Sequence, residues 1–412
     1  EKDPWLITSC DDLIALAGFL NSGDAAKNYN NCKGYYFKQT ADIDLTDVEN
    51  WEPIGYSDER CFSGNYDGGG HIIANASSTG KTFPARWGGH FATAGIFGWV
   101  DSGSVKNLHV KNASFEATGQ NNYSYVGGIT GVCSGASIQN CSVTYSTLES
   151  KCDDNNNNCA GSIAGYSFRG TFENCAAENN QVTSMTYGGG FVGEIDDEDE
   201  NGYVLSNSTF KNCYAADCTV TGVTPHTDGW SFIGGFAGQV TNEKPTAENC
   251  FVYRAKLSTD GTSASNKSIG VFAGNLWGNP PKYQSKINTP NCFYGECGTQ
   301  DNVGSAEQKT AEEFENGTVA KRLGVAFAQA RNYPKFKDSP ADYSAVDAAI
   351  AKANALKKDD YNDFSAVEAA VNAVVRGKPL SEQADVDNMA KAIEDAIAAL
   401  QYKGADYSKV NE

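Results

Sequence analysis

The stretch that decides the fold is IGGFAGQVTNEKPTAENCFV, residues 233–252. It joins a hydrophobic segment flanked by glycines to an Asn-Cys pair that ends 12 positions after the last glycine. The glycine-flanked segment occurs six times, with its final glycines at 98, 131, 165, 193, 238 and 274. The intervals run from 28 to 45 residues, which is the range of repeat architectures, so the pattern predicts a solenoid.

Each glycine segment has a downstream partner that begins with asparagine. The partners are Asn107-Leu108, Asn140-Cys141, Asn174-Cys175, Asn212-Cys213, Asn249-Cys250 and Asn291-Cys292. The residues between are mostly Gly, Ser, Thr, Asn, Val and Phe, which favours short strands. Each unit therefore predicts one coil of a parallel β-helix, with coils about 4.8 Å apart. Asparagine suits the bends, because it tolerates left-handed φ and its amide can bond to the asparagine of the next coil.

Apolar residues recur at fixed offsets from the cysteines and predict an inward stripe. Ile138, Phe172 and Phe210 precede the cysteine by three positions, and Val143, Ala177, Ala215 and Val252 follow it by two. The cysteines should form a core ladder of buried, reduced thiols, because in-register cysteines behave as small hydrophobes. Export would permit disulfides, and the candidate pairs are then Cys152–Cys159 and Cys10–Cys32.

Helical signals stand at both ends of the predicted β-helix. Ser9 precedes an apolar segment and reads as an N-cap. Thr310 and Glu313 form a capping-box pattern, so one or two short helices are expected before the helical region. Such caps would cover the open ends of a β-helix. The segment KFKDSP, 335–340, is interpreted as a hinge between two domains.

From residue 341 the sequence becomes alanine-rich, with apolar residues three and four positions apart. This period predicts three amphipathic helices that close into a bundle over 341–402. The motif ADYSAV at 341 returns as ADYSKV at 405. Residues 403–412 are therefore interpreted as the start of a further helical repeat, with more of the array expected beyond the chain.

Composition excludes several classes of protein. The net charge of −19 argues against nucleic acid as a partner. No apolar run approaches the ~20 residues of a membrane span. The chain opens with neither methionine nor a signal segment, so we expect a processed or excised piece of a larger protein. Thirteen cysteines lie between Cys10 and Cys297, without a Cys-x-x-Cys pair, so the common zinc and redox spacings are missing.

With these motifs in order, the glycine units resemble the GLUG motif of extracellular bacterial proteins. Upstream stretches support the resemblance: YYFKQTADIDL (35–45), WEPIG (51–55) and FSGNYDGGGHII (62–73). The resemblance covers about residues 5–336 and implies a right-handed parallel β-helix. The cysteines depart from typical GLUG repeats, in which apolar residues often fill that position.

Residues 341–402 resemble the FIVAR repeat, a three-helix module of gram-positive surface adhesins and extracellular carbohydrate enzymes. The predicted domains are thus a β-helix over 1–336, with its caps, and a helical bundle over 341–402. The two resemblances imply an extracellular protein that is secreted or associated with the cell wall.

One candidate metal site stands in the longest insertion, DDEDENG (196–202). Asp197, Asp199 and Asn201 fit the start of a calcium loop. The twelfth position is Ser208, where an EF-hand needs a glutamate, so a solvated acidic loop is the preferred reading. No other cofactor is predicted.

Catalytic signals are sparse. The four histidines are scattered, and neither a His-Glu-x-x-His nor a Gly-x-Ser-x-Gly motif occurs. Arg169 and Arg254 lie in coils without a carboxylate pair that the sequence can assign to them. Trp87, Trp99, Trp230 and Trp277 flank glycine units and suit either sugar stacking or, as we prefer, core packing. We therefore predict no catalytic residues.

The favoured function is adhesion or ligand presentation by a monomeric cell-surface β-helix with a helical spacer. Host or dietary glycans, or a surface protein, are the expected partners. Two alternatives stay open: a β-helical carbohydrate-active enzyme, either a lyase or a glycosidase, and a purely structural stalk.

Overall fold

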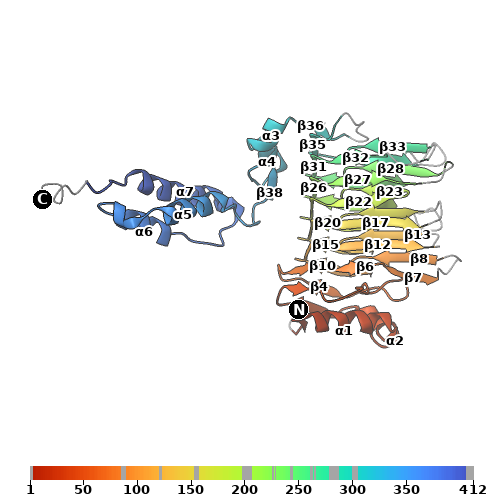
Figure 1. The fold of residues 1–412 in the computed structure, drawn as a ribbon. Helices are drawn as coiled ribbons and strands as arrows, with labels where there is room; N and C mark the ends of the chain where they lie inside the picture. The colour runs from red at the N-terminus through yellow and green to blue at the C-terminus, as the bar shows by residue number, and fades with distance from the viewer. Residues whose placement is uncertain are drawn as a thin grey trace. The chain divides into compact units, whose positions relative to one another are not determined.

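The computed structural model describes residues 3–84, 90–119, 123–152, 157–196, 207–224, 227, 229–241, 245–259, 263, 266–277, 287–298 and 305–404. The chain divides into two compact units, Glu1–Thr310 and Ala311–Glu412. The first unit is a parallel β-solenoid and the second is mainly helical (Figure 1). The predicted fold class, a β-helix followed by a small all-α bundle, is confirmed.

Five sheets run along the solenoid, and each central coil contributes one strand to each sheet. Sheets A and B flank the asparagine bend. Sheet A contains β1 (Trp5–Ile7), β2 (Tyr36–Gln39), β4 (Asn65–Asp67), β10 (Ser104–Lys106), β15 (Ser137–Gln139), β20 (Thr171–Glu173), β25 (Thr209–Lys211) and β30 (Thr246–Glu248). Sheet B contains β3 (Ile43–Asp44), β5 (Ile72–Ala74), β11 (His109–Lys111), β16 (Ser142–Thr144), β21 (Ala176–Glu178), β26 (Tyr214–Ala216), β31 (Phe251–Tyr253), β35 (Phe293–Gly295) and β36 (Glu307–Gln308).

The other three sheets complete each coil, and the glycine turns join sheet E to sheet C. Sheet D contains β6 (Ser77–Ser78), β12 (Ser114–Gly119), β17 (Thr147–Cys152), β22 (Gln181–Ser184), β27 (Thr219–Gly222) and β32 (Lys256–Ser258). Sheet E contains β7 (Lys81–Pro84), β8 (His90–Ala94), β13 (Tyr123–Gly127), β18 (Asn158–Gly161), β23 (Tyr187–Gly189), β28 (Trp230–Gly234) and β33 (Asn266–Gly270). Sheet C contains β9 (Phe97–Asp101), β14 (Thr130–Ser134), β19 (Ala164–Phe168), β24 (Val192–Asp196), β29 (Ala237–Thr241) and β34 (Ala273–Trp277).

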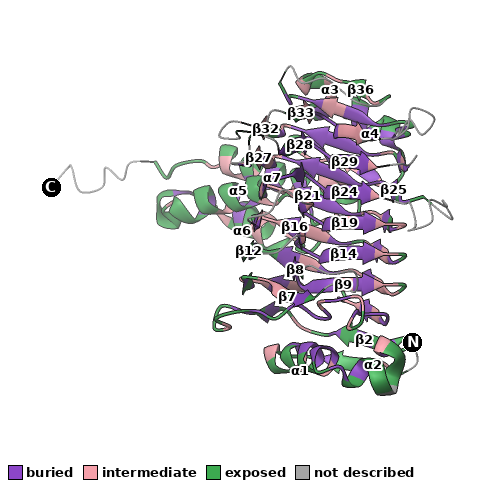
Figure 2. Cartoon of the chain, turned by 90° about the vertical axis from the view of Figure 1, so that its right-hand side faces the viewer, coloured by how far each residue is buried: buried purple, intermediate pink, exposed green. Residues whose placement is uncertain are grey.

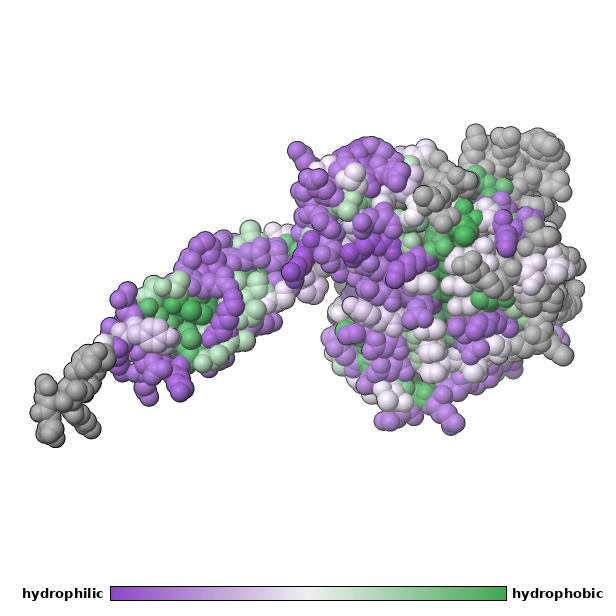
Figure 3. All heavy atoms as spheres, turned by 45° about the horizontal axis from the view of Figure 1, so that its top comes forward, coloured by the Kyte–Doolittle hydropathy of each residue, from purple (hydrophilic) through white to green (hydrophobic). Residues whose placement is uncertain are grey.

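Equivalent residues of successive coils lie in register, which confirms the predicted inward stripe. In sheet A, Ile138 pairs with Phe172 and Phe172 pairs with Phe210. The rings of Phe172 and Phe210 stack with centroids 4.9 Å apart. Buried residues fill the strands of sheet C in the same way (Figure 2). Hydrophilic side chains cover much of the solenoid face seen in Figure 3, as expected for strands that alternate inward and outward residues.

The asparagines of the A–B bend form the predicted ladder. Asn140, Asn174 and Asn212 have φ between 52° and 53°, the left-handed conformation that asparagine tolerates. The side-chain amide of Asn174 donates to Asn140 at 3.0 Å, and the amide of Asn212 donates to Asn174 at 2.9 Å. At the base of the ladder, Asn107 donates to the carboxylate of Asp67 at 2.8 Å. The bend is therefore stabilised by one amide chain that ends on an anion.

The cysteines next to these asparagines form the predicted core ladder. The members, Cys141, Cys175, Cys213, Cys250 and Cys292, are all buried and reduced. Their thiols donate to backbone carbonyl groups, as Cys175 does to Ile138 and Glu173, both at 3.4 Å. Each thiol thus satisfies its one donor inside the apolar core.

Neither candidate disulfide is present, because Cys10, Cys32, Cys152 and Cys159 are all free. For Cys152 and Cys159 the reason is structural. Cys152 packs in the main core, whereas Cys159 packs in a separate cluster between sheets E and C. The two cysteines are close in sequence, but their side chains belong to different packed regions, so the disulfide predictions are wrong.

Glycine is required at the E–C turns because the two strands approach closely. A Cβ on Gly189 would lie 1.8 Å from the carbonyl oxygen of Val192. The hydrophobic residue of the same turn, Phe191, points into the main core and is fully buried. The recurring glycine segment is therefore a close-packed turn that inserts an apolar anchor.

The N-terminal cap is present as predicted. Helix α1 (Cys10–Asn21) begins after Ser9, whose hydroxyl accepts from the backbone N–H of Asp12. Leu13, Leu16 and Leu20 of α1 pack into the main core. The short helix α2 (Asp24–Tyr29) and the 3₁₀ turn η1 (Asn30–Cys32) follow. The helix thus covers apolar residues at the first coil.

The second unit contains short helices, a hairpin and three longer helices. Its elements are α3 (Ala311–Glu315), α4 (Thr318–Leu323), β37 (Phe327–Gln329), β38 (Pro334–Phe336), α5 (Ser344–Ala355), η2 (Lys358–Asp360), α6 (Ser365–Asn372), η3 (Leu380–Glu382) and α7 (Gln383–Ala398). Val346, Val367 and Ile393, one from each longer helix, meet in one apolar core. The predicted three-helix bundle is therefore present.

Residues 335–340 are more constrained than the predicted hinge. Backbone N–H groups of Leu380 and Ser381 donate to the carbonyl groups of Ser339 and Lys337, at 2.6 and 2.8 Å. These bonds fix the segment to the start of η3, and the hinge interpretation stays a prediction. The repeated motif at 405–412 lies outside the described residues, and the tandem-array prediction stays open.

Candidate functional site

The predicted calcium candidates cannot be placed in a site. Asp197, Asp199 and Asn201 lie outside the described residues, as do His226 and Trp87. Within the described ranges, His, Cys, Asp and Glu do not gather in groups of three or more that could hold a metal ion. Calcium binding at the predicted loop is thus an untested expectation.

The described histidines of the coils make local contacts. His71 Nδ1 lies 3.3 Å from Asp42 Oδ1, and His109 Nδ1 lies 2.8 Å from Ser142 Oγ. Burial lowers the pKa of His109, so its imidazole is neutral at pH 7. Each of these contacts joins two neighbouring coils.

Tryptophans and arginines of the coils also pack locally. Trp99 packs against the cluster between sheets E and C, whereas Trp230 is 37% exposed. The guanidinium of Arg169 lies over the ring of Phe168, 4.3 Å from its centroid. Arg254 Nε lies 2.8 Å from Asp217 Oδ1 of the preceding coil. Trp99 therefore contributes to packing, as preferred from the sequence.

A polar cluster that sequence reasoning missed lies between sheets E and C. Sheet E contributes Tyr125, Cys159 and Tyr187 in register, and sheet C contributes Tyr166, Glu194 and Gln239 in register. We call these six residues the E–C cluster. The two columns face each other, since the rings of Tyr125 and Tyr166 are 5.0 Å apart and Cys159 contacts Glu194.

Glu194 is the central residue of the E–C cluster and is only 1% exposed. Its Oε2 atom accepts from Asn157 Nδ2 at 3.2 Å and from the Cys159 thiol at 3.4 Å. Its Oε1 atom accepts from Thr241 Oγ1 at 3.1 Å and from Gln239 Nε2 at 3.4 Å. One carboxyl group therefore links β18 of sheet E to β29, two coils further along the chain.

The surroundings of Glu194 favour its neutral form. Burial and the nearby carboxylate of Asp196 raise the pKa of Glu194 to about 8, although hydrogen bonds from Cys159, Thr241 and Gln239 act in the opposite direction. Burial also raises the pKa of the Cys159 thiol, and Glu194 and Asp196 raise it further. At pH 7 both groups are thus mainly protonated.

Asp196 adds a second carboxyl group to the same face of β24. It stands two residues after Glu194, and its Oδ2 atom accepts from the hydroxyl of Tyr166 at 3.3 Å. Asp196 is half-buried, whereas Glu194 is fully buried. The pair is therefore chemically unequal, with one enclosed acid and one acid nearer to solvent.

A signal for Glu194 exists in the repeat alignment. Glu194 directly follows the final glycine of its unit. The equivalent residues in the other copies are Trp99, Val132, Tyr166, Gln239 and Asn275, none of them charged. A single charge in an otherwise uncharged column indicates a special environment.

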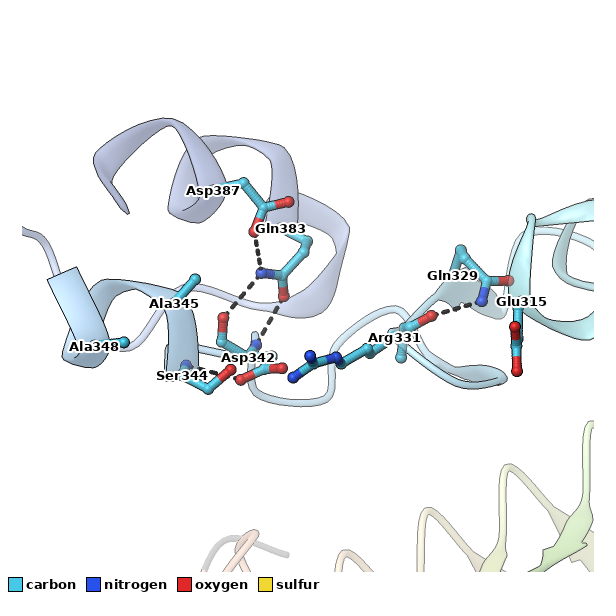
Figure 4. Close-up of a pocket in the computed structure, with 10 residues that line it drawn as sticks. Glu315, Gln329, Arg331, Asp342, Ser344, Ala345, Ala348, Gln383 and Asp387 are labelled. Carbon is cyan, nitrogen blue, oxygen red and sulfur yellow. Dashed lines mark hydrogen bonds between the residues drawn. The ribbon is translucent and has the colours of Figure 1, made fainter. Parts of the chain in front are cut away.

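The second unit contains a polar hollow of about 590 Å³ beside the start of α5 (Figure 4). Gln383 joins its walls, because its amide bonds the backbone of Asp342 at 2.7 and 2.9 Å and the carboxylate of Asp387 at 2.9 Å. Arg331 extends toward Asp342 from the hairpin side. Hydrogen bonds from Ser344, with a smaller contribution from Arg331, lower the pKa of Asp342. Most of its lining residues are exposed, and its charged groups are the carboxylates of Glu315, Asp342 and Asp387 and the guanidinium of Arg331.

Comparisons with known proteins bear mainly on the fold. No protein-family model matches the chain, so the GLUG and FIVAR resemblances remain predictions. A crystal structure of a provisionally assigned immunoglobulin A1 protease from Bacteroides ovatus is similar, with a TM-score of 0.52 and 19% identity. The similarity covers 82% of this chain and 93% of that chain. At this identity it establishes a shared solenoid fold.

Two other matches are more limited. A structure named IgA1 Protease has a TM-score of 0.37 and 16% identity, covering 74% of this chain and 21% of that one, and no argument rests on it. Halomucin of Haloquadratum walsbyi is 33% identical over 138 residues, 31% of this chain. The chain spans about 1% of the length of that curated relative. In the described part of the chain, no helix is both long enough and apolar enough to span a membrane.

Proposed function

We propose that this chain is part of a secreted or cell-surface protein whose solenoid presents a binding surface, with the helical unit as a spacer. The resemblances to extracellular GLUG and FIVAR modules support this proposal. So does a solenoid fold shared with a protein named for cleaving an immunoglobulin. The buried, hydrogen-bonded state of Glu194 favours presentation over catalysis.

The observation that carries the proposal is the outer face of sheet D. Polar and charged side chains stand there in columns, with one member from each coil. One column contains Ser114, Thr147, Gln181, Thr219 and Lys256, and its neighbour contains Glu116, Glu149, Thr183, Thr221 and Ser258. All are exposed or half-buried. Coils repeat at about 4.8 Å, so the face offers hydrogen-bonding groups at a regular spacing.

A regular row of hydroxyl, amide and charged groups suits an extended, repeating polar polymer. We propose a glycan chain of host or dietary origin as the ligand, bound along sheet D by a monomer without a cofactor. The net charge of −19 supports a monomer that does not bind nucleic acid. A protein ligand and calcium in the 197–201 loop are less well supported.

A glycan-array screen of the full chain tests the proposal. A double variant on sheet D, Thr183→Lys with Thr221→Lys, replaces two short hydroxyl side chains with long cationic ones. Thr171→Lys with Thr209→Lys makes the matched change on sheet A. We expect the wild type and the sheet A variant to bind extended glycans, and the sheet D variant to lose this binding. No glycan binding, or equal loss in both variants, would contradict the proposal.

A second candidate function is glycan cleavage: the burial of Glu194 argues against it, but Glu194 and Asp196 supply two neighbouring carboxyl groups. The two residues stand two positions apart on one face of β24, which places their Cβ atoms about 6.5–7 Å apart. Inverting glycosidases hold their two carboxyl groups about 6.5–9.5 Å apart. The raised pKa of Glu194 also suits a general acid. Release of reducing sugar by the wild-type chain, abolished in both Glu194→Gln and Asp196→Asn, would favour this function over presentation.

A further inference from the structure

Glu194 is positioned to hold two sheets together through its state of protonation. Its carboxyl group receives hydrogen bonds from Asn157 and Cys159 on the sheet E side and from Gln239 and Thr241 on sheet C. Sheets E and C also meet through the glycine turns and the rings of the E–C cluster. Glu194 is thus a point where several polar bonds cross between the two sheets.

Hydrogen bonds from Cys159, Thr241 and Gln239 compensate only part of a negative charge on Glu194, and in the part of the chain that the structure describes no cation faces it. The titratable groups that face it are Asp196 on its own strand, Cys159 on β18, Tyr125 on β13, Tyr166 on β19 and Tyr187 on β23. All of these are acids, and from β29 only the neutral side chains of Gln239 and Thr241 reach it. Among the described residues, no Lys, Arg or His forms an ion pair with Glu194. A buried charge without a counter-ion is costly.

We propose that Glu194 is a proton-controlled latch: its protonated carboxyl closes the E–C interface, and loss of the proton loosens this region of the solenoid. In the closed state the carboxyl supplies one hydrogen itself, and the bond to Thr241 Oγ1 reverses, so that this hydroxyl accepts the hydrogen instead of donating one. In the open state the anion repels Asp196 and draws water between the sheets. The midpoint follows the pKa of Glu194, about 8, so the latch closes in neutral and acid surroundings and opens in alkaline ones.

Cys159 provides a local reporter for this latch, because its thiol contacts Glu194 and is fully buried. Cys175 provides an internal control, because it is equally buried but lies in the main core. Both thiols gain reactivity as they ionise at high pH, so the informative quantity is the ratio of their labelling rates. That ratio cancels the intrinsic chemistry of the reagent.

The experiment is pulsed labelling of the full native chain with N-ethylmaleimide, followed by peptide mapping, at about pH 6.5 and about pH 9.5. We expect the Cys159/Cys175 ratio to rise at least about tenfold in the wild type, since the ionised fraction grows about tenfold per unit below the midpoint. In Glu194→Gln, whose amide resembles the protonated acid, the ratio should stay at its low-pH value. An unchanged wild-type ratio, or an equal rise in the variant, would overturn the proposal.

Hydrogen–deuterium exchange of the wild type keeps the test decisive if the variant does not fold. After correction for the chemical effect of pH, amides of β18, β24 and β29 should exchange faster at the higher pH. Amides of β15 and β20 in sheet A should not change. Equal changes in both groups of strands would mean general loosening and would also overturn the proposal.

Discussion

The thiol of Cys159 lies 3.4 Å from Oε2 of Glu194, so a buried cysteine and a buried acid from different coils share a hydrogen bond between two sheets. Neither residue lies in the inward ladders that hold the solenoid together. Their contact differs from the apolar contacts of the ladders. We expect the free energy of unfolding to depend on pH through Glu194.

Glu194→Gln should raise stability at neutral and alkaline pH. The pKa of Glu194 is raised from 4.5 to about 8 by folding, so the folded state retains a proton that the unfolded state releases. The stability contributed by the protonated acid is fully present below pH 4.5 and is lost as pH rises to about 8. The loss is on the order of 5 kcal/mol, at about 1.4 kcal/mol per pH unit. Urea unfolding of both proteins across this range measures it, and parallel pH profiles would contradict it.

Cys175→Asp should destabilise the solenoid by about 3–5 kcal/mol, because it buries a carboxyl group among apolar ladder residues. Cys175→Ala is the matched control and should cost only about 1–2 kcal/mol, through lost contacts and one lost thiol hydrogen bond. Chemical denaturation gives both values. Similar costs for the two variants would argue against a dry cysteine ladder.

Asn174→Ala and Asn174→Gly separate the two roles of the asparagine ladder. Both remove the hydrogen bonds to Asn140 and Asn212, worth about 1–3 kcal/mol together. Alanine also meets the strain of φ 53°, about 1 kcal/mol more, whereas glycine adopts this conformation freely. Thermal unfolding should therefore rank the wild type above the glycine variant, and the glycine variant above the alanine variant. An alanine variant as stable as the glycine variant would remove the conformational argument.

Gly189→Ala should destabilise the chain by several kcal/mol, since the new Cβ would lie 1.8 Å from the carbonyl oxygen of Val192. Gly18→Ala is the control: it stands inside α1, and nothing lies within 4 Å of its new Cβ. That change should stabilise the protein by about 0.5–1 kcal/mol through helix propensity. Differential scanning calorimetry of the two variants should show shifts of opposite sign.

Native labelling should modify Cys10 first, because it is half-exposed while the other 12 of the 13 cysteines are buried. Burial and the nearby Asp11 raise the pKa of the Cys10 thiol, so even this reaction should be slow at neutral pH. Mass spectrometry of the intact protein counts the labels. Rapid modification of the ladder cysteines would show that the core is open to solvent.

The ladders could be predicted from the sequence because each coil repeats its information. Asn174 and Cys175 recur at equivalent places in neighbouring copies, and in-register pairing turns that recurrence directly into a column. The repeat marks Glu194 as the one charge in its column, but its partners could not be predicted, because Cys159 and Gln239 come from two other coils and from two sheets. The face-to-face packing of sheets E and C that joins them is a tertiary property, invisible to the repeat period. The same packing separates Cys152 from Cys159, which their closeness in sequence made a false disulfide candidate.

The asparagine ladder also has a sense of direction. Every amide donates toward the N-terminal coils, and the last donor, Asn107, meets the carboxylate of Asp67. The asparagine of a coil inserted above Asp67 would donate its amide to the side-chain oxygen of the coil beneath and accept from the amide of the coil above. The stack can therefore lengthen there by gene duplication without losing a hydrogen bond. A coil inserted below Asp67 would face an anion that has no hydrogen to offer. The architecture is thus extensible from within and closed at its base, which limits how such a protein can change its length in evolution.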